Sequence, residues 1–180
     1  NSVADYNNHS FSLIQASSFE NDVGLFDFVT QQKVNDFQIS ENQTISGMQW
    51  LKPYTTLFYV AQDDILLFDT RTKAPISKTI DAGKYFIGGN ISYTLPFNFV
   101  VGNNANKQGM VSMFDLRKME KITSSVYPKE LREFDVHKHL PFSVAIADSL
   151  LSFNFEQGML ISQQQKIGFI PQSFSLHHSE

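Results

Sequence analysis

The residues that could carry chemistry include a closely spaced histidine pair, His137 and His139, which flank Lys138 near Asp135. On a strand, positions i and i+2 share a face, so two imidazoles could meet one metal ion. Further ligands at a suitable spacing are not evident in the sequence. We therefore interpret the segment as an inner strand that runs into a turn at Pro141, and we expect no metal site.

The carboxylates Asp27, Asp69 and Asp115 could act as general acids or bases, but each one directly follows a phenylalanine at the end of an apolar run. A carboxylate that recurs at the end of one type of strand usually accepts hydrogen bonds from the next turn. The pair Asp63 and Asp64 lies in a polar hairpin, where a solvated turn is its simplest interpretation. We expect no catalytic residue and no enzymatic activity.

Several other chemistries lack their sequence signatures. The chain has no cysteine, which excludes disulfides, thiol catalysis and zinc fingers. The glycine-rich phosphate loops and the Gly-x-Ser-x-Gly elbow are missing, so we expect no cofactor. Lys and Arg number 14 against 18 Asp and Glu, a net charge of -4 that disfavours direct binding to nucleic acid. With 42% hydrophobic and 18% charged residues, the chain is expected to fold.

The elements that carry these residues form a repeat. An apolar run that ends in Phe-Asp, or Phe-Asn in the last copy, occurs four times, and its final residues lie 42, 46 and 39 positions apart. This spacing agrees with the roughly 40–45 residues of a WD40 propeller blade and not with a heptad or a helical repeat. We expect the repeated residues to have structural roles: Phe26, Asp27, Phe68, Asp69, Phe114, Asp115, Phe153 and Asn154.

A second marker is a proline turn that keeps the same period. Pro53, Pro96 and Pro141 lie 43 and 45 residues apart, and an apolar segment follows each of them. Proline fixes φ and lacks an N–H donor, so it suits a turn between strands. Together with polar hairpins before the Phe-Asp runs, the markers predict a four-stranded antiparallel unit: an inner strand, a second strand, a Phe-Asp strand and an outer strand.

The combined pattern resembles the WD40-repeat β-propeller family in a degenerate form. Phenylalanine stands where the family has the Trp of its Trp-Asp dipeptide, and the family's Gly-His pair is absent. The resemblance implies an all-β fold of four-stranded antiparallel blades in one domain over residues 1–180. The expected blade units are approximately 11–40, 45–81, 89–127 and 133–163, with closing strands within 167–176. An ordinary β-sandwich with repeating hairpins is the alternative fold.

Four units are fewer than propellers of this family usually have. Phe11 is expected to lie in a second strand with no inner strand before it. We therefore expect an incomplete propeller, a piece of a larger one, while the alternative is a closed four-bladed ring completed by the C-terminal strands. The only helical candidate is a turn or two at Pro128–Phe134, where proline suits the first helical position.

Two sets of residues are candidates for binding a partner. The segment Asp81–Phe86 is expected to be a contact loop, since exposed aromatics are enriched at interfaces. Arg71 and Arg117 each follow an Asp by two residues, which predicts a small basic stripe or, alternatively, ordinary solvated charges. The candidate residues are Lys84, Tyr85, Phe86, Arg71, Lys73, Arg117 and Lys118.

The function expected from these features is a non-catalytic scaffold for protein–protein interaction within a larger intracellular complex, with other subunits or peptides as partners. One alternative is a subunit that contacts DNA or RNA mainly through its partners, and another is an all-β hydrolase. The absence of cysteine agrees with a cytoplasmic or nuclear location. No apolar stretch approaches the roughly 20 residues that a membrane-spanning helix needs.

Overall fold

The computed structural model is made of β-strands in four antiparallel sheets, each with four strands. It describes residues 2–7, 12–17, 22–27, 29–38, 45–50, 56–61, 64–69, 75–81, 85–92, 94–95, 97–156, 160–166 and 176. No helix occurs within these ranges. The prediction of an all-β chain with four-stranded antiparallel sheets is therefore confirmed. The chain divides into two compact units, Asn1–Asp81 and Ala82–Glu180.

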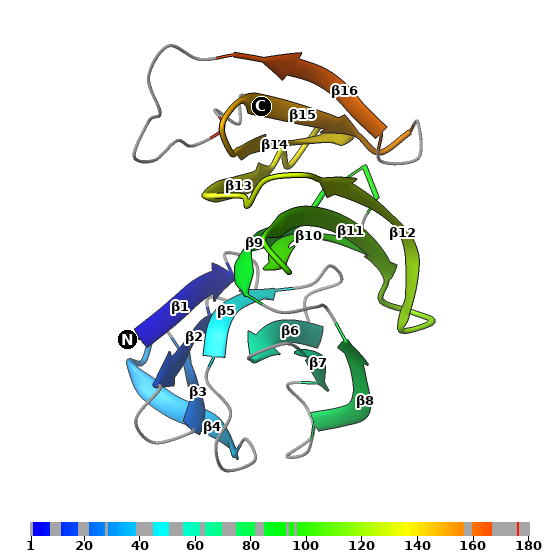
Figure 1. The fold of residues 1–180 in the computed structure, drawn as a ribbon. Helices are drawn as coiled ribbons and strands as arrows, with labels where there is room; N and C mark the ends of the chain where they lie inside the picture. The colour runs from blue at the N-terminus through cyan, green and yellow to red at the C-terminus, as the bar shows by residue number, and fades with distance from the viewer. Residues whose placement is uncertain are drawn as a thin grey trace. The chain divides into compact units, whose positions relative to one another are not determined.

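The N-terminal unit contains two sheets with the strand orders β1-β2-β3-β4 and β5-β6-β7-β8 (Figure 1). Consecutive strands pair in each sheet, and β1 lies next to β5. The strands are β1 (Ser2–Asn7), β2 (Ser12–Ser17), β3 (Asp22–Asp27), β4 (Gln32–Gln38), β5 (Ile45–Trp50), β6 (Thr56–Ala61), β7 (Asp64–Asp69) and β8 (Pro75–Asp81).

The C-terminal unit repeats this arrangement with the orders β9-β10-β11-β12 and β13-β14-β15-β16, and β9 lies next to β13. In both units the first strands of successive sheets are neighbours. The strands are β9 (Phe86–Ile91), β10 (Asn98–Ala105), β11 (Gln108–Asp115), β12 (Glu120–Tyr127), β13 (Glu133–Val136), β14 (Phe142–Ile146), β15 (Leu150–Asn154) and β16 (Leu160–Gln165).

Two expectations about individual elements are wrong. A strand does precede Phe11, because β1 pairs with β2 from Ser2↔Ser17 to Asn7↔Ser12. The sequence concealed it, since this first repeat lacks the proline that marks the turn in the others. The helical turn at Pro128–Phe134 is also absent. There the backbone is engaged elsewhere: the Arg132 N–H donates to the Ile146 carbonyl at 2.7 Å, and β13 begins at Glu133.

The third strand of every sheet carries the same irregularity. Its pairing with the outer strand shifts register between Leu25 and Phe26 in β3, between Met113 and Phe114 in β11, and between Ser152 and Phe153 in β15. In β7 the shift lies one residue earlier relative to the repeated phenylalanine, between Leu66 and Leu67. In three sheets the shift lies directly before the repeated phenylalanine. Bulges bend a strand and increase its twist. The repeat therefore extends to backbone geometry and includes more than residue types.

The core of the C-terminal unit lies between its two sheets. Val100, Val111 and Met113 of one sheet belong to the same buried cluster as Phe134 and Phe153 of the other. β13 approaches β10 closely, because a Cβ atom added at Gly102 would lie 2.4 Å from Cγ of Phe134. The absence of a side chain at Gly102 thus lets the aromatic ring rest against the backbone of β10.

Candidate interaction surface

Tyr85, from the predicted contact loop, is the most exposed large hydrophobic side chain described in the C-terminal unit, at 71%. It lies just before β9 with φ at 52°, in the left-handed region. Its carbonyl accepts a hydrogen bond from the Asn104 N–H at 3.1 Å, which ties the strained backbone to β10. Phe86 is half-buried at the start of β9, and Lys84 lies outside the described residues. An aromatic side chain is therefore presented to solvent from a constrained position.

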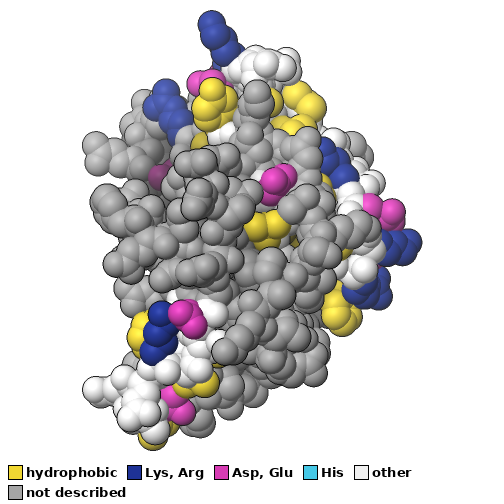
Figure 2. All heavy atoms as spheres, turned by 90° about the horizontal axis from the view of Figure 1, so that it is seen from below, with side chains coloured by type: hydrophobic (Ala, Val, Ile, Leu, Met, Phe, Trp, Pro, Cys, Tyr) yellow, Lys and Arg dark blue, Asp and Glu magenta, His cyan; other side chains and the backbone are white. Residues whose placement is uncertain are grey.

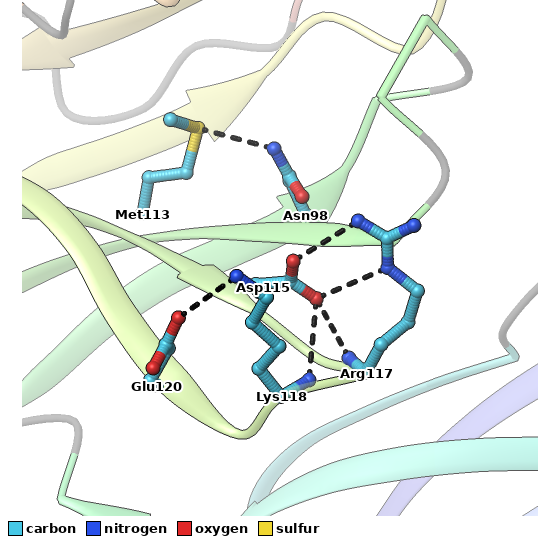
Figure 3. A network of polar contacts seen from close by, with 6 residues as sticks. All are labelled: Asn98, Met113, Asp115, Arg117, Lys118 and Glu120. Carbon is cyan, nitrogen blue, oxygen red and sulfur yellow. Dashed lines mark hydrogen bonds and ion pairs between the residues drawn. The ribbon is translucent and has the colours of Figure 1, made fainter.

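Arg117, from the predicted basic stripe, is held by neighbouring groups in the β11–β12 turn. Its guanidinium lies 3.0 Å from Asp115 Oδ2, with a second bond from Nε to Oδ1 at 3.3 Å (Figure 3). Cζ also lies 5.0 Å from the ring centroid of Phe97. Lys118 forms an ion pair with Glu120 at 3.5 Å. Arg117 thus stabilises its own turn, while Arg71 and Lys73 lie outside the described residues.

The repeated Asp and Asn residues accept hydrogen bonds from the turns that follow them. Asp115 Oδ1 accepts the N–H groups of Arg117 at 2.8 Å and Lys118 at 3.3 Å. Asp27 Oδ1 accepts those of Val29 at 2.8 Å and Thr30 at 2.9 Å, and Asn154 Oδ1 accepts that of Glu156 at 2.8 Å. The side chain of Asp69 lies outside the described part.

These contacts favour the ionised carboxylates. The side-chain hydrogen bond from Arg117 is the main cause that lowers the pKa of Asp115, and the backbone hydrogen bond from Thr30 is the main cause for Asp27. A carboxylate that accepts several donors is a poor general base, because protonating it costs those hydrogen bonds. Among the repeated phenylalanines, Phe114 and Phe153 are buried, Phe26 is half-buried, and the side chain of Phe68 is not described.

The turns after two of these Asp residues share a backbone conformation. Gln31 and Met119 each stand four residues after the Asp, and both have φ at 56°. In the last repeat the matching position is Gly158, outside the described residues. Residues other than glycine are disfavoured at a left-handed φ, so glycine would suit this position best. Of the four repeats, only the last has a glycine there.

We expect Met119→Gly to raise the free energy of unfolding by about 1 kcal/mol, because it relieves the left-handed strain. Urea denaturation of the purified chain measures the effect. Lys118→Gly is the matched control one position earlier, where no left-handed φ occurs, and it should be neutral or destabilising. A Met119→Gly variant less stable than wild type would contradict the assignment.

His137 acts as an acceptor in the β13–β14 loop. Its Nδ1 accepts the N–H groups of His139 at 3.1 Å and Leu140 at 3.0 Å, and its ring lies 5.0 Å from that of Phe142. The strand ends at Val136, so the two imidazoles do not share a strand face. Within the described ranges no group of three or more potential metal ligands occurs. His137 therefore stabilises a turn in this structure.

A polar cluster at Tyr127 joins the two sheets of the C-terminal unit. The Tyr127 hydroxyl donates to Asp148 Oδ1 at 2.7 Å and accepts a hydrogen bond from Gln164 Nε2 at 3.0 Å. Burial is the main cause that raises the pKa of Tyr127, and the hydrogen bond from Tyr127 is the main cause that lowers the pKa of Asp148. The C-terminal end of the outer strand β12 is thereby bonded to the other sheet of the unit, a feature that sequence reasoning missed.

On the face seen in Figure 2, described hydrophobic, basic and acidic side chains occur together in several separate places. Among the described residues of the C-terminal unit, the exposed large hydrophobic ones are Tyr85, Phe97, Ile122, Val126 and Leu140. Ile122 and Val126 were not predicted to be functional, although their alternation with Ser124 is visible in the sequence. As for membrane insertion, no described helix is long and apolar enough to cross a bilayer.

No protein-family model matches the chain, and no curated protein matches it. Solved structures do. Raptor from Chaetomium thermophilum matches with a TM-score of 0.84 at 14% identity, over 99% of this chain and 17% of that one. A chain of the Mitotic Checkpoint Complex matches with a TM-score of 0.73 at 11% identity, over 91% of this chain and 51% of that one.

Hydrazine Synthase from Kuenenia stuttgartiensis matches with a TM-score of 0.69 at 13% identity, over 87% of this chain and 51% of that one. The chain thus spans about a sixth to a half of the length of these three chains. At these identities the likeness is one of fold, and it agrees with the repeated antiparallel sheets described above.

Proposed function

We propose that this chain is a degenerate WD40-like propeller segment that serves as a non-catalytic scaffold within an intracellular multi-subunit complex. The four sheets would be consecutive blades, as suggested by their common strand order and by the recurring bulge in the third strand. Among the proteins of similar fold, one is by its title part of a Mitotic Checkpoint Complex.

The observation that carries the proposal is the exposed ring of Tyr85 on a strained backbone. Left-handed φ in a bulky residue costs about 1 kcal/mol or more, and such strain clusters at functional sites. Tyrosine also supplies large contact area at interfaces for little loss of conformational entropy. A residue that lowers stability and exposes an aromatic ring is better explained by binding than by folding.

The repeated carboxylates support a non-catalytic role. Asp27 and Asp115 are engaged with backbone donors of their own turns, and Asp115 also pairs with Arg117. Those contacts lower the pKa of both carboxyl groups, and the carboxylate oxygens are occupied by hydrogen bonds within the turns. A general acid or base would need a carboxyl group that faces a substrate.

We expect Tyr85→Gly to raise the unfolding free energy by about 1 kcal/mol and to lower partner capture at least about tenfold. Stability is measured by urea denaturation, and capture by quantitative affinity purification from a native extract of the source cells. Tyr85→Asn separates the two effects, because asparagine tolerates left-handed φ but lacks the ring. Lys107→Gly, also at a left-handed position, should leave capture unchanged.

A different result would reject the proposal. If both Tyr85 variants capture the same partners in the same amounts as wild type, Tyr85 is not a contact residue. If the chain shows turnover in a broad hydrolase screen, and Asp27→Asn or Asp115→Asn abolishes it, the scaffold assignment is wrong.

A further inference from the structure

Within the part of the chain that the structure describes, the outer strand β12 is the end strand of its sheet and carries exposed apolar side chains. It is the end strand of the sheet β12-β11-β10-β9 and is eight residues long. Ile122 is 47% exposed and Val126 is 55% exposed, with the exposed Ser124 between them. The end strand of a sheet can pair along its outer edge with a strand of another protein.

Side chains near both ends of β12 contact other strands of the C-terminal unit. Tyr127 is buried and bonded to Asp148 and Gln164, and the ammonium of Lys121 lies 5.6 Å from the ring centroid of Phe114. From Met113↔Thr123 to Gly109↔Tyr127 its pairing with β11 runs without a register shift. The stretch from Thr123 to Tyr127 is thus a regular, preorganised edge, and Ile122 stands at the register shift that precedes it. Preorganisation reduces the entropic cost of binding.

The charges around this stretch select the occupant. Lys121 directly precedes Ile122, and Lys129 follows Val126 by three residues. From 115 to 130 there are four basic residues (Arg117, Lys118, Lys121, Lys129) and three acidic ones (Asp115, Glu120, Glu130), a local net charge of +1. The chain as a whole carries -4. The edge is therefore locally basic on an acidic protein.

We propose that β12 binds an extended acidic segment of a partner protein, which adds to the sheet as a further strand. Backbone pairing would supply affinity, alternate apolar residues of the partner would pack on Ile122 and Val126, and its carboxylates would meet Lys121 and Lys129. This deepens the scaffold function proposed above and rests on it. A second copy of β12 is disfavoured, because the same two lysines would flank both edges.

The closing experiment uses a synthetic eight-residue peptide that alternates valine with glutamate, at a concentration where it stays monomeric. Titration of the whole chain should give a dissociation constant of about 10–100 μM and should slow amide exchange about tenfold or more within Ile122–Val126. A peptide that alternates valine with lysine should bind at least about tenfold more weakly. Raising the salt concentration should weaken the acidic peptide.

Paired variants separate binding from folding. Ile122→Thr with Val126→Thr keeps β propensity and should reduce affinity at least about tenfold. Lys121→Glu with Lys129→Glu should lose the acidic peptide and gain the basic one, a swap that mere destabilisation would not produce. Val34→Thr on β4 removes another exposed side chain, at 63%, and should leave binding unchanged.

Equal binding of both peptides, or slowed exchange only outside β12, would overturn the proposal. So would slowed exchange at Ile122–Val126 that depends on protein concentration without peptide, which indicates self-pairing. If the acidic peptide does not bind while capture still depends on Tyr85, the edge assignment fails and the scaffold function stands. If it binds while the Tyr85 variants capture normally, β12 is supported and the role of Tyr85 fails.

Discussion

Gly102→Ala is expected to lower the free energy of unfolding by about 3 kcal/mol, because it inserts a methyl group into an occupied space. The new Cβ would lie 2.4 Å from Cγ of Phe134 and 2.8 Å from its Cβ and Cδ2. Phe134 is closely packed against β9 as well, because its carbonyl oxygen would lie 2.6 Å from a Cβ atom added at Gly88. Urea denaturation and thermal melting of the whole chain measure the loss.

Two comparisons isolate this contact. Gly24→Ala on β3 would meet the far end of the Phe26 side chain, which can rotate away, so its effect should be smaller. In a double-mutant cycle, Gly102→Ala with Phe134→Ala should cost at least about 1 kcal/mol less than the sum of the single changes. Strict additivity would show that the ring and the glycine are not in contact.

Asn104→Asp is expected to destabilise the chain by about 2–4 kcal/mol at neutral pH. The buried amide of Asn104 donates to the Leu131 carbonyl at 2.8 Å and accepts the Leu131 N–H at 2.7 Å. A carboxylate keeps the acceptor but loses the donor, and it places negative charge against a carbonyl oxygen. The change alters one functional group and almost no volume, so packing is preserved.

The pH dependence supplies the control for this variant. Facing a carbonyl in a buried site, the new carboxyl group should have a folded-state pKa above its unfolded value. The N104D variant should therefore recover stability relative to wild type as the pH falls from about 7 to about 4, where the protonated acid can donate again. A deficit that stays constant over this range would mean that the lost donor is not the cause.

The strand pattern was largely readable from the sequence because its markers are local. Phe-Asp runs and proline turns depend on adjacent residues, and they located the third strands and the turns before the second strands. β1 escaped because its turn lacks proline. The segment before β13 was misassigned because Leu131 bonds to Asn104, 27 positions earlier, and a local pattern does not report such a partner.

The candidate surface was only partly predictable for the same reason. Tyr85 stood in the segment that the sequence singled out, and its side chain is exposed. Arg117 looked like a free cation, but Phe97 lies against it from a loop 20 positions away. The alternation of Ile122, Ser124 and Val126 was visible, yet only strand order shows that β12 lies at the edge of its sheet.

The Tyr127 hydroxyl bonds to the β14–β15 hairpin at Asp148 and to β16 at Gln164, so three outer segments share one atom. Opening of β12 alone would break both hydrogen bonds, and release of either partner would leave the buried hydroxyl with only one of them. These segments should therefore fray as one cooperative unit and not strand by strand. Proteases that need a locally unfolded edge would then cleave only after that joint opening. The hydrogen bonds of the Tyr127 hydroxyl would therefore slow proteolysis of all three segments.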